Sequence, residues 1–179
     1  MRRYVVLGAV MLSVATASPA AQFSSGAVTP RPMYADDQDL LIRLIIVARS
    51  QVELGSMALQ RATRPDITAF ARLMLTDFTR VDTDLTAIAS EMNVGARSID
   101  TEHRTREARL DSLWGREFER EYAEAMFEVN QDLVSMLRIF AIESSKRQAD
   151  DPLTRWARDM LPKAEQYLEK ARQLVQTVR

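Results

Sequence analysis

Residues 36–65 read DDQDLLIRLIIVARSQVELGSMALQRATRP, and this stretch decides the fold class. The acidic pair Asp36-Asp37 is typical of a helix start, and Arg64-Pro65 is typical of a stop. Between them, apolar residues recur at alternating spacings of four and three, which places them on one helix face. This stripe consists of Leu41, Ile45, Ala48, Val52, Gly55, Leu59 and Ala62. We therefore predict a helix over 36–62, and Gly55 on its packed face allows a neighbour to approach closely.

Three more long helices are predicted by the same periodicity. The second opens at Pro65 and ends near Asn93, with Gly95 suited to a left-handed cap. The third covers 116–145, and the fourth runs from Asp150-Asp151-Pro152 to the C-terminus. Their stripes are Ile67, Phe70, Met74, Phe78, Val81, Leu85, Ile88 and Met92, then Phe118, Tyr122, Met126, Val129, Leu133, Met136 and Phe140, and finally Leu153, Trp156, Met160, Ala164, Tyr167, Ala171, Leu174 and Val178.

The links between these helices predict their topology. Tight links join the first helix to the second and the third to the fourth, whereas residues 96–115 form a long connection with a short helix over 101–114. Two antiparallel hairpins joined by a long crossover make an all-α, ferritin-like four-helix bundle, with a simple up-and-down bundle as the alternative. Pro162 lies inside the fourth helix, where we expect it to kink or locally open the helix.

The composition excludes many kinds of chemistry. Among 179 residues there are no cysteines and a single histidine, which removes disulfides, thiolate nucleophiles and the usual zinc and di-iron ligand sets. The net charge of −1 leaves no excess of positive charge, so nucleic-acid binding is disfavoured. Only 5 glycines and 6 prolines leave few turns for an all-β fold.

The N-terminus has the pattern of an export signal. Arg2 and Arg3 precede the apolar run 4–14 and the small-residue tract 15–21, with cleavage expected after Ala17 or near Ala21. An uncleaved N-terminal anchor is the alternative. We therefore predict a signal peptide over 1–21, a flexible leader over 22–35 and a bundle domain over 36–179. This organisation predicts a periplasmic protein with no integral membrane span after cleavage.

Several single residues are candidates for chemistry. His103 lies in the connection without a nucleophile motif, and we expect it to be a partly exposed helix residue. Glu121 and Glu124 are predicted on an outer, solvated face, as is the mixed-charge run around Glu119. The stripe methionines are expected to fill the core rather than to hold copper. Tyr122 and Tyr167 are candidates for hydrogen bonds to Asn130 or Asp77 inside the bundle.

A set of ordered landmarks resembles a known family. They are Glu53-Leu54-Gly55 with Ala58 and Leu59, Pro65, Phe70-Ala71, Met74-Leu75-Thr76-Asp77, His103, Leu113-Trp114-Gly115 with Phe118, Tyr122 and Met126, and Leu161-Pro162 with Leu168. Their order over about 39–171 resembles the domain-of-unknown-function-4142 family, exported bacterial proteins described as ferritin-like and sometimes labelled predicted outer-membrane proteins. Members of that family usually carry histidines where this chain has Phe78, Asn130 and Tyr167. The resemblance therefore implies a lost metal site, and we expect no cofactor and no metal ligands.

These observations favour a non-enzymatic, exported bundle that acts as a structural, interaction or stress-associated protein, with an unknown protein partner or self-association. The alternative is a carboxylate-based metal-binding protein that uses residues such as Glu53 and Asp77. A third hypothesis is peripheral envelope contact or dimerisation through the apolar start of the first helix. The residues that would form a residual polar site in the core are Glu53, Asp77, Asn130 and Tyr167.

Overall fold

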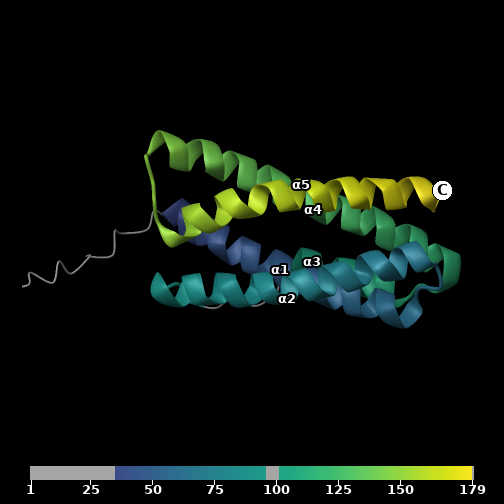
Figure 1. Ribbon diagram of the computed structural model, residues 1–179. Helices are drawn as coiled ribbons and strands as arrows, with labels where there is room; N and C mark the ends of the chain where they lie inside the picture. The colour runs from purple at the N-terminus through teal and green to yellow at the C-terminus, as the bar shows by residue number, and fades with distance from the viewer. Residues whose placement is uncertain (1–34, 96–100, 179) are drawn as a thin grey trace, which may run out of the picture. The chain divides into compact units, whose positions relative to one another are not determined.

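The computed structural model describes residues 35–95 and 101–178, and that part of the chain is helical with short turns (Figure 1). The helices are α1 (Ala35–Arg61), α2 (Pro65–Glu91), α3 (Thr101–Asp111), α4 (Gly115–Lys146) and α5 (Pro152–Thr177). Each occupies the range expected from its apolar stripe. The predicted signal peptide and almost all of the predicted leader lie outside the described residues. Along the described helices, none combines the length and apolar character needed to cross a membrane.

The four long helices form two antiparallel hairpins that pack against each other. The α1–α2 turn contacts the start of α4 through Glu119, and Asp37 of α1 pairs with Arg147 at the end of α4 at 2.9 Å. Asp66 near the start of α2 accepts a hydrogen bond from Thr177 at the end of α5. Hence α1 is antiparallel to α4, and α2 is antiparallel to α5. Because α2 and α4 run in the same direction, the bundle is ferritin-like, and the up-and-down alternative is wrong.

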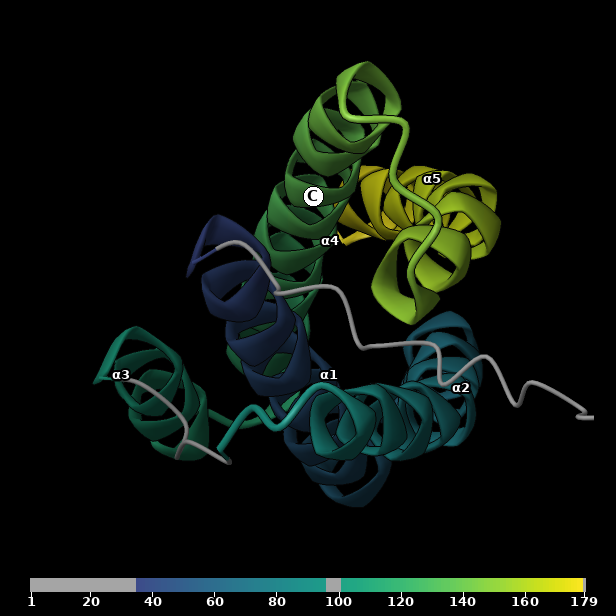
Figure 2. The same cartoon turned by 90° about the vertical axis from the view of Figure 1, so that its left-hand side faces the viewer.

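The short helix α3 lies outside the four long helices, on the α1 side (Figure 2). It is held by a buried leucine, Leu110, and by polar contacts at its C-terminal end. Arg61 of α1 pairs with the Asp111 carboxylate and also donates to its backbone carbonyl, while Arg109 pairs with Glu121 of α4 at 2.9 Å. The sequence predicted that Glu121 is solvated. In the structure, its ion pair with Arg109 instead connects α3 to α4.

The predicted stripes supply most of the core, but some of their members lie only at its edge. These partly buried residues are Val52, Leu59, Ala62, Met92, Met136, Trp156 and Val178. Leu54, Ala58 and Leu137, which the predicted stripes left out, are fully buried. Gly55 lies on the α1–α2 interface, where an added Cβ would come within 3.0 Å of the Ala71 carbonyl oxygen, so the close approach is confirmed. Met74 and Met126 are fully buried as packing residues. The apolar start of α1, including Leu41 and Leu44, is also buried, so this segment offers little of the exposed apolar face that the envelope-contact hypothesis needs.

Two local predictions about helix shape need correction. The left-handed residue that ends α2 is Asn93, with φ of 56°, and not Gly95. Asn tolerates this conformation, and the bond from Val94 N to Ala89 O at 2.8 Å closes the cap. α5 continues without a break through Pro162, which lies at an exposed position, so the predicted local opening is wrong, whereas a kink at this proline stays a prediction. Solvent at that surface can satisfy the carbonyl that proline leaves without a donor.

Glu119 is buried rather than solvated, and it holds the α1–α2 turn. One carboxylate oxygen accepts hydrogen bonds from Thr63 N at 2.7 Å, from Thr63 Oγ1 at 2.9 Å and from Arg64 N at 2.9 Å. Burial favours the neutral acid, but these three donors outweigh it and hold the pKa of Glu119 below its ordinary value. The mixed-charge sequence did not predict this role, because the Thr63 and Arg64 donors that need an acceptor belong to the other hairpin.

Candidate functional site

The predicted polar core residues are only partly brought together. Tyr167 on α5 donates to the Asp77 carboxylate on α2 at 2.8 Å, and its ring contacts Phe78 with centroids 5.6 Å apart. Burial, followed by the bond to Asp77, raises the pKa of Tyr167. Asn130 is fully buried on α4, and its Nδ2 donates to the Met126 carbonyl at 2.7 Å. The contact predicted between a core tyrosine and Asp77 is thus confirmed.

Asn130 lies at the same level of the bundle as a second buried amide, Gln51 of α1. Thr63 contacts Glu119 across the seam between α1 and α4. Gln51 lies as many residues before Thr63 as Gln131, the neighbour of Asn130, lies after Glu119. Because α1 and α4 are antiparallel, Gln51 and Asn130 lie at nearly the same level along the bundle axis. Both amides are fully buried, and Gln51 Nε2, Gln51 Oε1 and Asn130 Oδ1 find no hydrogen-bond partner within the described protein.

Between α1 and α2, the contacts of Arg49 with Asp82 and of Gly55 with Ala71 bracket Gln51 and Phe78. Phe78 and its ring partner Tyr167 therefore lie at about the level of Gln51 along the bundle axis. The three positions where the resemblance implies histidines therefore share one layer with Gln51. Sequence reasoning missed Gln51, although it lies on the same helix face as Ala48 and Gly55.

Glu53 lies outside this layer. It is exposed on α1, and its side chain shares a hydrogen bond with Glu107 of α3. That bond, together with burial and the charge of Glu53, raises the pKa of Glu107 to about 7, while Arg104 acts in the opposite direction. The four predicted residues thus do not converge, because the exposed face of α1 points Glu53 towards the crossover helix.

The described residues contain no group of three or more acidic or histidine side chains arranged to hold a metal ion. The lone histidine is not part of such a group. His103 is 9% exposed and lies against the bundle, so the expectation of a partly exposed residue is wrong. Its burial follows from the position of α3 against α1, which the sequence pattern did not reveal.

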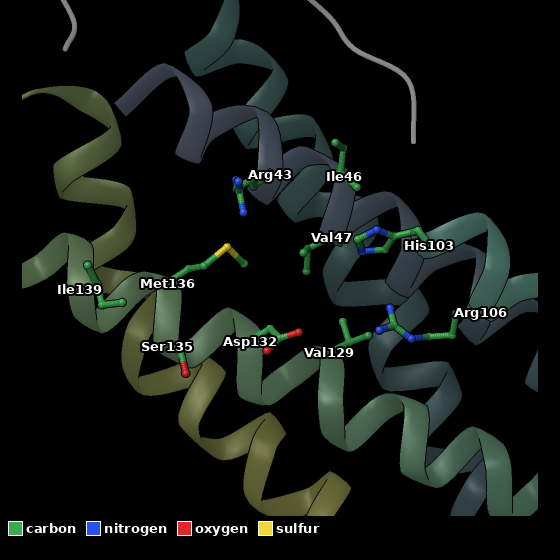
Figure 3. Close-up of a pocket in the computed structure, with 10 residues that line it drawn as sticks. All are labelled: Arg43, Ile46, Val47, His103, Arg106, Val129, Asp132, Ser135, Met136 and Ile139. Atoms are coloured by element: carbon green, nitrogen blue, oxygen red, sulfur yellow. The ribbon is translucent and has the colours of Figure 1, made fainter. Parts of the chain in front are cut away.

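The most distinctive concavity is a groove between α1, α3 and α4, with a volume of about 340 Å³ (Figure 3). We call it the α3 groove. Its lining consists of Arg43, Ile46 and Val47 from α1, His103 and Arg106 from α3, and Val129, Asp132, Ser135, Met136 and Ile139 from α4. Figure 3 shows the side chains of Arg43, Arg106 and Asp132 directed into the space above this apolar floor. Five of the ten lining residues are apolar and five are polar, so the groove combines an apolar wall with groups that can orient a bound molecule.

The α3 groove opens onto an apolar strip of α4. Ile139, at its rim, is 63% exposed, and Ile142, one turn further along α4, is 56% exposed. Other hollows exist between α2 and α5, but one of them is lined mainly by polar residues, including Asp77, Arg80 and Asp84. The second, near Phe70 and Leu174, is apolar but has fewer charged side chains facing it. The α3 groove alone among these joins guanidinium groups to large exposed aliphatic residues.

Comparisons with known proteins agree with this architecture. The profile of the "Domain of unknown function (DUF4142)" matches residues 22–174, and the chain therefore belongs to that family. A search of curated protein sequences gives no match. Among solved structures, the chain is similar to "CopM in the Cu(II)-bound form", with a TM-score of 0.63 and 19% identity, over 80% of this chain and 97% of that one. At this identity the likeness shows a shared helical fold.

Proposed function

We propose that this protein is an exported, non-enzymatic binding protein of the cell envelope that holds an apolar partner in the α3 groove. The observation that carries the proposal is the groove itself, an open space of about 340 Å³ with a buried aliphatic floor and an exposed aliphatic rim. Exposed apolar surface that continues into a concavity is typical of binding sites. Export is supported by the charged, apolar and small-residue segments at the N-terminus.

The floor of the groove is rigid enough to be a preformed site. Val47 and Val129 are 5% and 2% exposed and belong to the continuous core, so they cannot move without disturbing the bundle. The rim residue Ile139 is different, since most of its side chain lies in water. A partner that covers Ile139 gains free energy from burying apolar surface without repacking the core.

The proposal is tested with a neutral fluorescent probe, N-phenyl-1-naphthylamine, and the protein purified after expression of the full chain. We expect saturable binding of one probe per chain, and a loss of at least tenfold in affinity for Ile139→Asp. The control is Thr76→Asp, an exposed substitution on α2 that lies away from the groove. Equal binding by the two variants would show that the groove is not the site.

The location is tested separately by cell fractionation. The full chain should appear in the periplasmic or envelope fraction in a shortened form, whereas a chain without residues 1–21 should stay in the cytoplasm. A full chain that remains cytoplasmic and uncleaved would contradict export.

Metal binding is the second candidate, and the observation in its favour is that the similar structure, CopM, is in a Cu(II)-bound form. The carboxylates proposed from the sequence, Glu53 and Asp77, lie on different helices and are engaged by Glu107 and Tyr167 respectively. Elemental analysis after growth with added copper, iron or zinc tests this candidate. Stoichiometric metal that is lost in Glu53→Gln or Asp77→Asn would favour it over the apolar partner.

A further inference from the structure

One face of α4 is covered by α3 near its beginning and is open near its end. Glu121 marks the covered part, because it pairs with Arg109 of α3 at 2.9 Å. Ile139 lies about five full turns further along α4, and thus on the same face, because each turn takes about 3.6 residues. Ile139 is 63% exposed and Ile142 is 56% exposed. The described residues therefore leave apolar side chains in water on a face that packs against a helix elsewhere.

The open part of this face has a sequence that is self-complementary about Ile139. We call it the α4 strip, and its residues are Asp132, Ser135, Met136, Ile139, Ile142, Glu143 and Lys146. Met136 and Ile142, both apolar, lie three residues before and after Ile139. Asp132 and Lys146, of opposite charge, lie seven residues before and after it. Residues at these spacings share one helix face, and all of the strip except Met136 is exposed.

Two copies of the α4 strip match each other when they pack antiparallel across a two-fold axis at Ile139. Such an axis brings each residue opposite the one that lies equally far on the other side of Ile139. The apolar residues then meet at the centre, and Lys146 meets Asp132 of the second copy at each end. Lys146 already pairs with Glu143 of its own helix at 2.8 Å, but its side chain is 65% exposed and has further protons to donate. The symmetry thus joins an apolar centre to an ion pair at each end.

We propose that the α4 strip is a self-association surface on which a second copy of this chain packs antiparallel about Ile139, with Asp132 and Lys146 paired between the copies. This inference goes beyond the proposed function, since it concerns the outer face of α4 and not the floor of the α3 groove. The charges select the antiparallel arrangement, because parallel packing in register would set like charges against each other. They also disfavour an anionic lipid surface, because the strip carries two carboxylates and one ammonium group.

The size of the α4 strip sets the strength of the contact. From Asp132 to Lys146 the strip is about 21 Å long, at a rise of about 1.5 Å per residue. Two helices in contact over this length bury less than the roughly 800 Å² per partner of a standard interface. We therefore expect a reversible dimer with a dissociation constant on the order of 10 μM. Its ion pairs are exposed, so high salt should weaken it.

Sedimentation velocity at increasing protein concentration measures the dimer, with protein purified after full-chain expression. We expect Asp132→Lys and Lys146→Asp each to weaken dimerisation about tenfold, because each sets like charges opposite one another at both ends. An equimolar mixture of these two variants should form a heterodimer, since a chain with lysine at both positions then faces a chain with aspartate at both. The matched controls are Asp84→Lys on α2 and Lys163→Asp on α5. They make the same charge changes at exposed positions away from the strip and should leave dimerisation unchanged.

The opposite charge changes give a gain of pairing, which loss of folding cannot imitate. The double variant Asp132→Lys with Lys146→Asp should dimerise with itself like the wild type, because its charges are exchanged rather than removed. Wild-type protein that stays monomeric at about 100 μM would overturn the inference. A dimer that survives both single variants would also overturn it, and so would a mixture that fails to pair. A monomer that binds phospholipid vesicles would assign the α4 strip to membranes and likewise overturn the inference.

The proposed function is tested separately by the same variants. Lys146 lies outside the lining of the α3 groove, so Lys146→Asp should still bind N-phenyl-1-naphthylamine. Loss of probe binding with dimerisation intact would count against the groove alone, and loss of dimerisation with probe binding intact would count against the α4 strip alone.

Discussion

The two core tyrosines should respond in opposite directions to loss of their hydroxyl groups. Tyr122 is fully buried, and its hydroxyl has no hydrogen-bond partner among the described protein groups. A buried hydroxyl without a partner costs about 1–3 kcal/mol, and a small void left by the oxygen offsets part of the gain from its removal. We expect Tyr122→Phe to raise the free energy of unfolding by about 1 kcal/mol.

Tyr167→Phe removes a hydrogen bond to a carboxylate. The bond to Asp77 is 2.8 Å long, and such charge-assisted bonds contribute about 1.5–3 kcal/mol when well shielded. Because this pair lies at the edge of the core, we expect a loss of about 1 kcal/mol. The Phe78 ring contact should survive the substitution, since it does not involve the hydroxyl.

Urea unfolding followed by circular dichroism measures both changes at constant m-value. In a chain of this length, 1 kcal/mol corresponds to a change in melting temperature of about 2–4 °C. Equal destabilisation by both substitutions would contradict this expectation, because it would mean that the Tyr122 hydroxyl has a hydrogen-bond partner of comparable value. A double variant with Asp77→Asn separates the Tyr167 bond from other effects, since its two changes should not be additive.

Three further predictions concern the turns and the crossover. Glu119→Ala should destabilise by about 2–3 kcal/mol, as charged hydrogen bonds are lost. Because the folded pKa of Glu119 is lowered, its contribution should be present at neutral pH and should be lost as pH falls through that lowered pKa, which urea titrations at several pH values would show. Gly55→Ala should cost about 1 kcal/mol through overpacking, whereas Gly95→Ala, with open space around it, should be neutral in the same assay. Because the folded pKa of Glu107 is about 7, the free energy of unfolding should fall as pH rises from about 4.5 to 7. Glu53→Gln should lower the pKa of Glu107 in an NMR titration, and an unchanged pKa would contradict the pairing of Glu53 with Glu107.

The long helices were predictable because each buries one stripe, and a stripe is visible in a single sequence. Their hairpin order followed from link lengths, since a short link forces neighbours to be antiparallel while a long crossover does not. The contact between Tyr167 and Asp77 could also be predicted from the sequence, because both residues lie near the inward faces of their helices. These features depend on local spacing.

Features that depend on a second helix were missed. Glu119 stands in a mixed-charge run typical of a solvated face, yet the backbone donors at Thr63 and Arg64 draw it into the bundle. His103 and the α3 groove depend on the placement of α3, an 11-residue helix that covers only part of the seam between the longer α1 and α4. The apolar periodicity of one helix does not show how much of that helix a second helix covers.

The most direct test of a binding groove is amide hydrogen exchange of the protein with and without saturating N-phenyl-1-naphthylamine. Protection should increase in peptides that cover 43–47, 103–106 and 129–139, the three segments that line the groove. Peptides from α2 and the second half of α5 should exchange at unchanged rates. Protection confined to α2 and α5, or uniform exchange throughout the chain, would contradict the account.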